Sequence, residues 1–154
     1  MNKKGFTVIE LVLVVSIISI LLLMARPSIQ VPLERSILET EAQKIAGDIR
    51  LTQQLAYTQG RDFHFEIDIT ERYYKIRPSN PFESSIKRET LDRRIKRITC
   101  NFAGIPGGSH SSLKRLTYTP TGIPSQTGTI ELIMGSGIKK SIRVAVATGR
   151  VVIR

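Results

Sequence analysis

Hydrophobic and polar positions divide the chain into three consecutive patterns. Residues 6–25 are almost continuously apolar. Residues 26–60 are amphipathic, and one stripe at helical spacing contains Leu38, Ala42, Ile45, Ile49 and Ala56. From residue 61 onward apolar and polar residues alternate, which indicates strands with one buried face. The pattern therefore predicts an α+β fold, with a long N-terminal helix packed on an antiparallel β-sheet formed by residues 61–154.

The helical part of this pattern has two expected features. Pro27 and Pro32 are expected to interrupt or bend the helix just outside the apolar run, because proline lacks a backbone N–H donor. Gly60 is a candidate C-terminal cap. The first 60 residues are therefore predicted to form one long, bent helix. A separate surface helix that follows a linker is the alternative.

The strand pattern is clear in some segments and open in others. Phe63 to Ile69 predicts a strand whose residue His64 faces solvent, and a returning strand ends at Pro78. Residues 78–102 stay open, because Leu91, Ile95, Ile98 and Phe102 have helical spacing in a charged, Thr-rich stretch. Loops are predicted at 104–112 and 120–128, a strand at 116–118, and a terminal β-meander at 129–134, 138–147 and 150–153.

The apolar run is long enough to matter for localisation. Its twenty residues would span about 30 Å as a helix, which is the thickness of a bilayer's hydrocarbon core. Lys3 and Lys4 would hold its N-terminal end in the cytoplasm. A cleavable signal peptide usually has a shorter apolar region, and a plain signal anchor leaves Glu10 unexplained.

A resemblance to a known family accounts for Glu10. It is carried by the residues Lys4-Gly5-Phe6-Thr7-Val8-Ile9-Glu10-Leu11. They resemble the processing site of type IV prepilins and type II secretion pseudopilins. The resemblance implies that a prepilin peptidase removes the leader, residues 1–5, between Gly5 and Phe6 and methylates the new amine of Phe6. It also implies that Glu10 pairs with such an amine during assembly. The transmembrane helix would then be residues 6–25, continued by an amphipathic helix over residues 26–60.

The rest of the chain adds a softer resemblance to one group within that family. The segments 42–56 and 147–151 resemble those of minor pseudopilins of the GspH/FimT type, and the chain is also similar to competence (ComGD-like) pseudopilins. This resemblance implies the pilin fold and a single-pass inner-membrane protein with an extracytoplasmic head, which is extracted into a filament. The implied partners are other pilins or pseudopilins, an inner-membrane assembly platform and membrane lipid. The filament could serve secretion, adhesion or DNA uptake.

Composition and charge change this picture in one respect. The formal net charge is +10, and residues 87–154 contain thirteen Lys or Arg against three Asp or Glu. An excess of this size favours an anionic partner. The alternative function is therefore a membrane-anchored DNA-binding minor pilin, whose candidate DNA-binding residues share the rim of the terminal meander: Lys139, Lys140, Arg143, Arg150 and Arg154.

The sequence offers little chemistry of its own. It shows no nucleophile–base arrangement, phosphate-binding loop or metal-ligand spacing, so we expect no cofactor and no enzymatic activity. His64 and His110 are expected to be solvated, and Cys100 a small buried hydrophobe. Glu83, Glu89 and Asp92 form no matched acid pair.

Overall fold

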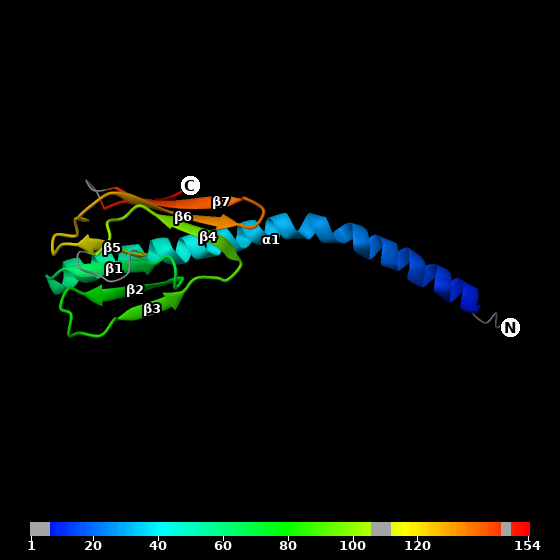
Figure 1. The fold of residues 1–154 in the computed structure, drawn as a ribbon, viewed down its shortest axis with the longest axis horizontal. Coiled ribbons are helices and arrows are strands. Elements are labelled where there is room, and N and C mark those ends of the chain that lie inside the picture. The colour runs from blue at the N-terminus through cyan, green and yellow to red at the C-terminus, as the bar shows by residue number, and fades with distance from the viewer. Residues whose placement is uncertain (1–6, 106–111, 146–148) are drawn as a thin grey trace. The chain divides into compact units, whose positions relative to one another are not determined.

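The computed structural model consists of one long helix and eight strands among the residues that it describes (Figure 1). The backbone is described for residues 7–105, 112–145 and 149–154, and the side chains of residues 24–29 are excluded. The chain divides into two units, Met1–Arg35 and Ser36–Arg154. We refer to the second unit as the head.

Helix α1 (Val8–Gln59) belongs to both units. It passes through Pro27 and Pro32 without a break in the helical backbone, so the alternative of a linker and a separate surface helix is wrong. Each proline removes one N–H donor, whereas the turns on either side keep their own hydrogen bonds. Gly60, at φ 62°, ends the helix in the left-handed conformation, which confirms the predicted cap.

The head contains two antiparallel sheets among the described residues, where the sequence predicted one. The first sheet has the order β3-β2-β1-β5. Its strands are β1 (Phe63–Asp68), β2 (Tyr73–Pro78), β3 (Lys87–Thr90) and β5 (Leu113–Tyr118). The second has the order β4-β6-β7-β8. Its strands are β4 (Ile95–Cys100), β6 (Gly128–Met134), β7 (Lys139–Val144) and β8 (Val151–Ile153).

The terminal β-meander is confirmed, because β6, β7 and β8 pair in sequence order. The open segment 78–102 contains β3 and β4. Its helical spacing does not produce a helix, since β3 pairs with β2 and β4 pairs with β6. Most of the predicted loop 104–112 lies outside the described residues, as does Thr148 of the last turn.

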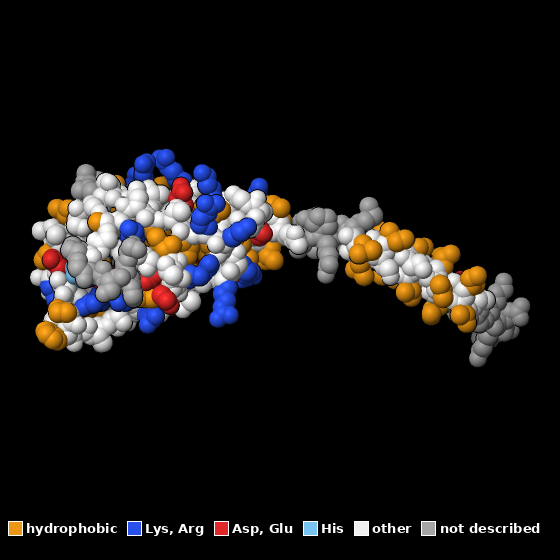
Figure 2. All heavy atoms as spheres, viewed as in Figure 1, with side chains coloured by type: hydrophobic (Ala, Val, Ile, Leu, Met, Phe, Trp, Pro, Cys, Tyr) orange, Lys and Arg blue, Asp and Glu red, His pale blue; other side chains and the backbone are white. Residues whose placement is uncertain are grey.

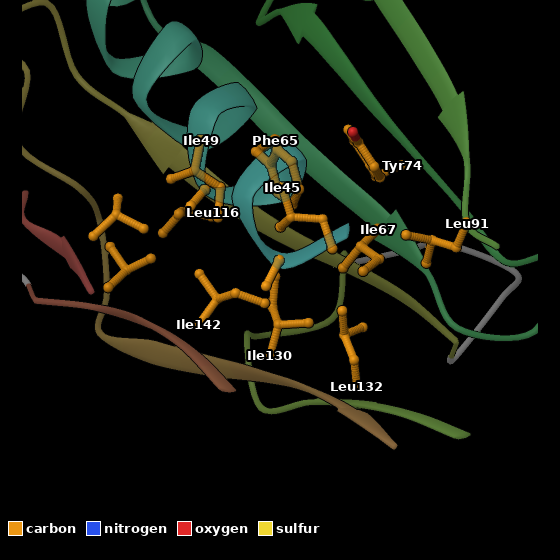
Figure 3. Packing of buried hydrophobic residues seen from close by; sticks show 14 of the residues in the cluster. Ile45, Ile49, Phe65, Ile67, Tyr74, Leu91, Leu116, Ile130, Leu132 and Ile142 are labelled. Carbon is orange, nitrogen blue, oxygen red and sulfur yellow. The ribbon is translucent and has the colours of Figure 1, made fainter. Parts of the chain in front are cut away.

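The predicted stripe of α1 forms the centre of the core. Leu38, Ala42, Ile45, Ile49 and Ala56 are all buried. Figure 3 shows Ile45 and Ile49 among side chains from both sheets, such as Phe65 of β1 and Ile142 of β7. The helix therefore holds the two sheets together through one shared apolar cluster.

Candidate functional site

The N-terminal unit presents an apolar helical surface with one acid near its beginning. Every described side chain from Thr7 to Leu23 is exposed, including that of Glu10. The backbone N–H groups of Glu10 and Leu11 both donate to the carbonyl of Thr7, so Glu10 lies in the first turn of α1. A carboxylate there interacts favourably with the positive end of the helix dipole. Gly5 and Phe6, the predicted cleavage and methylation residues, lie outside the described residues.

Among the described residues, no helix is both long enough and apolar enough to cross a membrane. The predicted span, residues 6–25, includes Phe6 and the side chains of residues 24 and 25, which lie outside the described part. The membrane span therefore stays a prediction.

The five candidate DNA-binding residues do not form one group. Lys139 and Arg143 alternate with the buried Ile142 and Val144 along β7, so they lie on the outer face of the second sheet. Arg154 follows β8 directly opposite Ser141, and the two residues exchange both backbone hydrogen bonds. Lys139, Arg143 and Arg154 are therefore neighbours on one face, which we call the outer triad.

The other two candidates are placed differently. Lys140 lies on the inner side of β7, and its Nζ is 2.6 Å from Oε2 of Glu39 on α1. The hydrogen bond from Lys140 lowers the pKa of Glu39. Arg150 precedes β8 and lines an open groove together with Arg50 and Gln53 of α1. The prediction of a single basic rim is therefore wrong, because the pleat of β7 separates Lys139 and Arg143 from Lys140.

Two buried carboxylates, Glu66 and Asp48, connect elements of the head, and the sequence pattern singled out neither of them. Glu66 of β1 is 1% exposed, and its carboxylate lies 2.7 Å from Arg115 Nη2 and 3.1 Å from Lys75 Nζ. Burial alone would raise the pKa of Glu66, but hydrogen bonds from Lys75 and Arg115 outweigh it and lower the pKa. This cluster connects β1 to both of its neighbouring strands.

The second buried carboxylate, Asp48, connects α1 to the first sheet. It accepts hydrogen bonds of 2.8 Å from Tyr74 Oη of β2 and from Lys87 Nζ of β3. Burial, together with the bond to Asp48, raises the pKa of the Tyr74 phenol. The only signal in the sequence was an acid placed beside an apolar helical stripe.

Known proteins resemble this chain in two respects, the sequence of its N terminus and its fold. Residues 1–25 match the prokaryotic N-terminal methylation motif. The chain has a TM-score of 0.59 and 15% identity with the minor pseudopilin EpsH of the type 2 secretion system of Vibrio cholerae, covering 76% of this chain and 95% of that one. With the type IV minor pilin FimU of Pseudomonas aeruginosa the TM-score is 0.61 at 14% identity, over 79% and 90% of the two chains. The chain has a prepilin-type N terminus and the fold of a minor pseudopilin. No curated protein shows significant sequence similarity to this chain.

Three further polar residues that the sequence singled out, His64, Glu83 and Asp92, each have a partner within this pilin-fold head. His64 was expected in solvent but is buried, because cross-strand neighbours on both sides cover the central strand β1. Its Nδ1 lies 2.9 Å from Thr117 Oγ1, and burial, reinforced by nearby Arg115, lowers its pKa. Glu83 and Asp92 pair with Arg61 and Arg94, respectively.

Reactive or metal-binding groups are not evident in the described part of the chain. No cluster of three or more potential metal ligands occurs there. Cys100 is half-buried, and burial raises the pKa of its thiol to about 11, which keeps it protonated at neutral pH. His110 lies outside the described residues. The absence of enzymatic activity and of a cofactor stays a prediction.

Proposed function

We propose that this protein is a minor pilin or pseudopilin subunit of a filament of the type II secretion or type IV pilus kind. The observation that carries the proposal is the combination of a methylation motif over residues 1–25 with a pilin-fold head. The exposed apolar surface of α1 from Val8 to Leu23 supports it, because a surface of this extent needs lipid or neighbouring helices around it.

Processing and the charge pair complete the proposed mechanism. Prepilin peptidase cleaves after Gly5 and methylates the amine of Phe6, and residues 6–25 hold the subunit in the inner membrane. Glu10 then pairs with the Phe6 amine of its own or a neighbouring subunit. An ammonium–carboxylate pair is far more stable in a low-dielectric environment than either charge alone. Recruitment of a subunit would thus satisfy a charge that is otherwise unpaired in lipid.

The test is replacement of Glu10 by Val in the full chain. Glu10→Val makes the segment more apolar, so the variant should still enter the membrane and still be cleaved. It should fail to co-purify with other pilins or to enter filaments, because the charge pair is missing. Glu34→Val, outside the apolar segment, serves as the matched control. Normal co-assembly of Glu10→Val would refute the charge-pair mechanism.

A second candidate function, DNA binding during DNA uptake, is favoured by the outer triad. Arg154 is the hydrogen-bonded partner of Ser141, and the Cα atoms of such partners are about 5.5 Å apart. Lys139 and Arg143 lie on either side of Ser141 along β7, so the three basic residues are close neighbours on one exposed face. Lys and Arg side chains gather over β7 in the space-filling view (Figure 2). Each phosphate that the triad neutralises would release counterions. The slope of log affinity against log salt concentration is then about −0.9 for each phosphate contact.

Three contacts correspond to a slope of about −3 in log affinity against log salt. Replacing both Arg143 and Arg154 by Gln should flatten this slope by about 2 for any DNA sequence, because phosphate contacts do not read bases. Lys140→Gln is the matched control, since Lys140 already pairs with Glu39. An unchanged slope in the Arg143/Arg154 variant would rule out the triad as a DNA site.

A further inference from the structure

A second group of cations, which shares Lys139 with the outer triad, lies at the base of the head, the end at which α1 enters. Arg93, Lys96, Arg97 and Lys139 are exposed, and within the described residues none of them makes an ion pair or a side-chain hydrogen bond. We call these four residues the basal cluster. They lie around the start of β4 and the turn between β6 and β7, beside the first head turns of α1 (Figure 1).

A β-bulge gives this cluster its shape. The pairing of β4 with β6 shifts register between Ile95 and Arg97, so Lys96 is an extra residue without a partner on β6. In a regular strand Lys96 and Arg97 would point to opposite faces. Here both line the same open groove, of about 440 Å³, together with Gly135 and Gly137 of the turn between β6 and β7. The bulge thus places two adjacent cations at one concave surface.

Two of the carboxylates near this groove are already neutralised, whereas Glu131 of β6 accepts a hydrogen bond from Thr99 and makes no ion pair within the described residues. Asp92 pairs with Arg94 at 2.6 Å, and the hydrogen bonds from Arg94 lower the pKa of Asp92 to about 2. Glu39 pairs with Lys140. Glu131 supplies one negative charge beside the four positive charges of the basal cluster, so the cluster keeps a positive charge and the groove is complementary to an anion.

The position of the cluster along the chain indicates which anion. Asp92 and Arg94 share a small cleft with Ser36 and Thr40, the first head residues of α1. Along the chain, only residues 24–35 separate the first residue of the head from Leu23, the last residue of the exposed apolar run whose side chain is described without a gap. A segment anchored in lipid would hold the groove near lipid headgroups at high effective concentration. Basic residues next to a membrane segment typically bind anionic headgroups.

We propose that the basal cluster binds the phosphates of anionic phospholipid while the subunit is anchored in the membrane. Lys96 and Arg97 bind the phosphate in the groove, and Arg93 and Lys139 add to the positive electrostatic potential around it. The inference rests on the membrane anchoring in the proposed function. Duplex DNA is the competing ligand, but nothing positions it at the base rather than at the outer triad.

The experiment uses the full chain in vesicles of phosphatidylcholine, with or without phosphatidylglycerol. The variant Cys100→Ser with Gly135→Cys carries a fluorophore beside the groove, because a Cβ at Gly135 meets no atom within 4 Å. Quenching by a lipid with a headgroup-attached quencher then reports docking of the base on the membrane. We expect strong quenching only in vesicles that contain phosphatidylglycerol, and loss of quenching at high salt.

Neutralising the groove tests the residues directly. Each basic residue near an anionic surface changes docking about fivefold, so Lys96→Gln with Arg97→Gln should lower the ratio of docked to free heads roughly 25-fold. Arg143→Gln with Arg154→Gln removes the same charge from the outer triad and should leave quenching unchanged. Equal quenching in both vesicle types, or equal loss from both pairs of substitutions, would overturn the inference.

Two further outcomes separate this inference from its rivals. Flotation with pure phosphatidylcholine vesicles reports the anchor alone, so failure to float contradicts the anchoring, whereas flotation without headgroup quenching contradicts only the lipid contact. If Lys96→Gln with Arg97→Gln abolishes duplex DNA binding but leaves quenching intact, the groove serves a nucleic acid and the lipid assignment is wrong.

Discussion

The buried charge cluster around Glu66 allows the sharpest test of how the head is held together. Glu66→Gln keeps the size of the side chain but removes its charge. Lys75 and Arg115 would then lose the carboxylate that both of them contact. Because these contacts join β1 to β2 and to β5, the substitution weakens the centre of the first sheet.

The magnitude follows from the exposure of the three side chains. Removing one member of a buried ion pair typically costs about 3–5 kcal/mol. Glu66 is 1% exposed, but the side chains of Lys75 and Arg115 keep 22% and 27% of their exposure. Water can therefore solvate the two remaining cations in part, and we expect a loss of about 2–3 kcal/mol in the free energy of unfolding at neutral pH.

The pH dependence provides an independent check. The folded pKa of Glu66 is lowered, so its contribution is fully present above the unfolded-state pKa of about 4.3 and is lost as the pH falls through the folded value. The variant cannot be protonated at this position. The difference between wild type and Glu66→Gln should therefore shrink as the pH falls below about 4.

The assay is urea unfolding of the full chain in detergent, followed by tyrosine fluorescence. All four tyrosines lie in the head, so the signal is independent of the N-terminal helical segment. Glu83→Gln is the matched control, because the pair between Glu83 and Arg61 is exposed and its removal should leave stability nearly unchanged. Equal effects of the two substitutions, or a Glu66→Gln difference that persists in acid, would refute the reasoning.

Two other predictions concern packing and processing. Gly128→Ala should destabilise the head by about 1–3 kcal/mol in the same assay, because the new Cβ would lie 2.1 Å from ring atoms of the buried Phe102, whereas Gly135→Ala should have little effect. An intact-mass measurement of protein from its native membrane should show the loss of residues 1–5 and the gain of one methyl group, and Gly5→Val should leave the precursor uncut. Full-length wild-type protein in cells with active prepilin peptidase would contradict the processing.

The sequence by itself determined the elements whose signals are local. The apolar stripe of α1 requires only helical spacing, and Ile45 and Ile49 lie in the core as that spacing predicts. The glycine at position 60 ends the helix because it accepts a positive φ at little cost. The meander of β6, β7 and β8 follows from alternation between strong turn residues. Resemblance at residues 4–11 pointed to the methylation motif that matches residues 1–25.

Tertiary structure decided whatever depends on contacts between distant segments. Alternation along β1 placed His64 and Glu66 on its outer side, but only the pairing with β2 and β5 covers them with long side chains. The helical spacing of residues 91–102 did not produce a helix, because β4 within this segment pairs with β6 of the second sheet. Likewise, adjacent basic residues look alike in the sequence. The pleat of β7 separates Lys139 from Lys140, and the bulge in β4 brings Lys96 and Arg97 together, since strand register rather than composition fixes where each charge points.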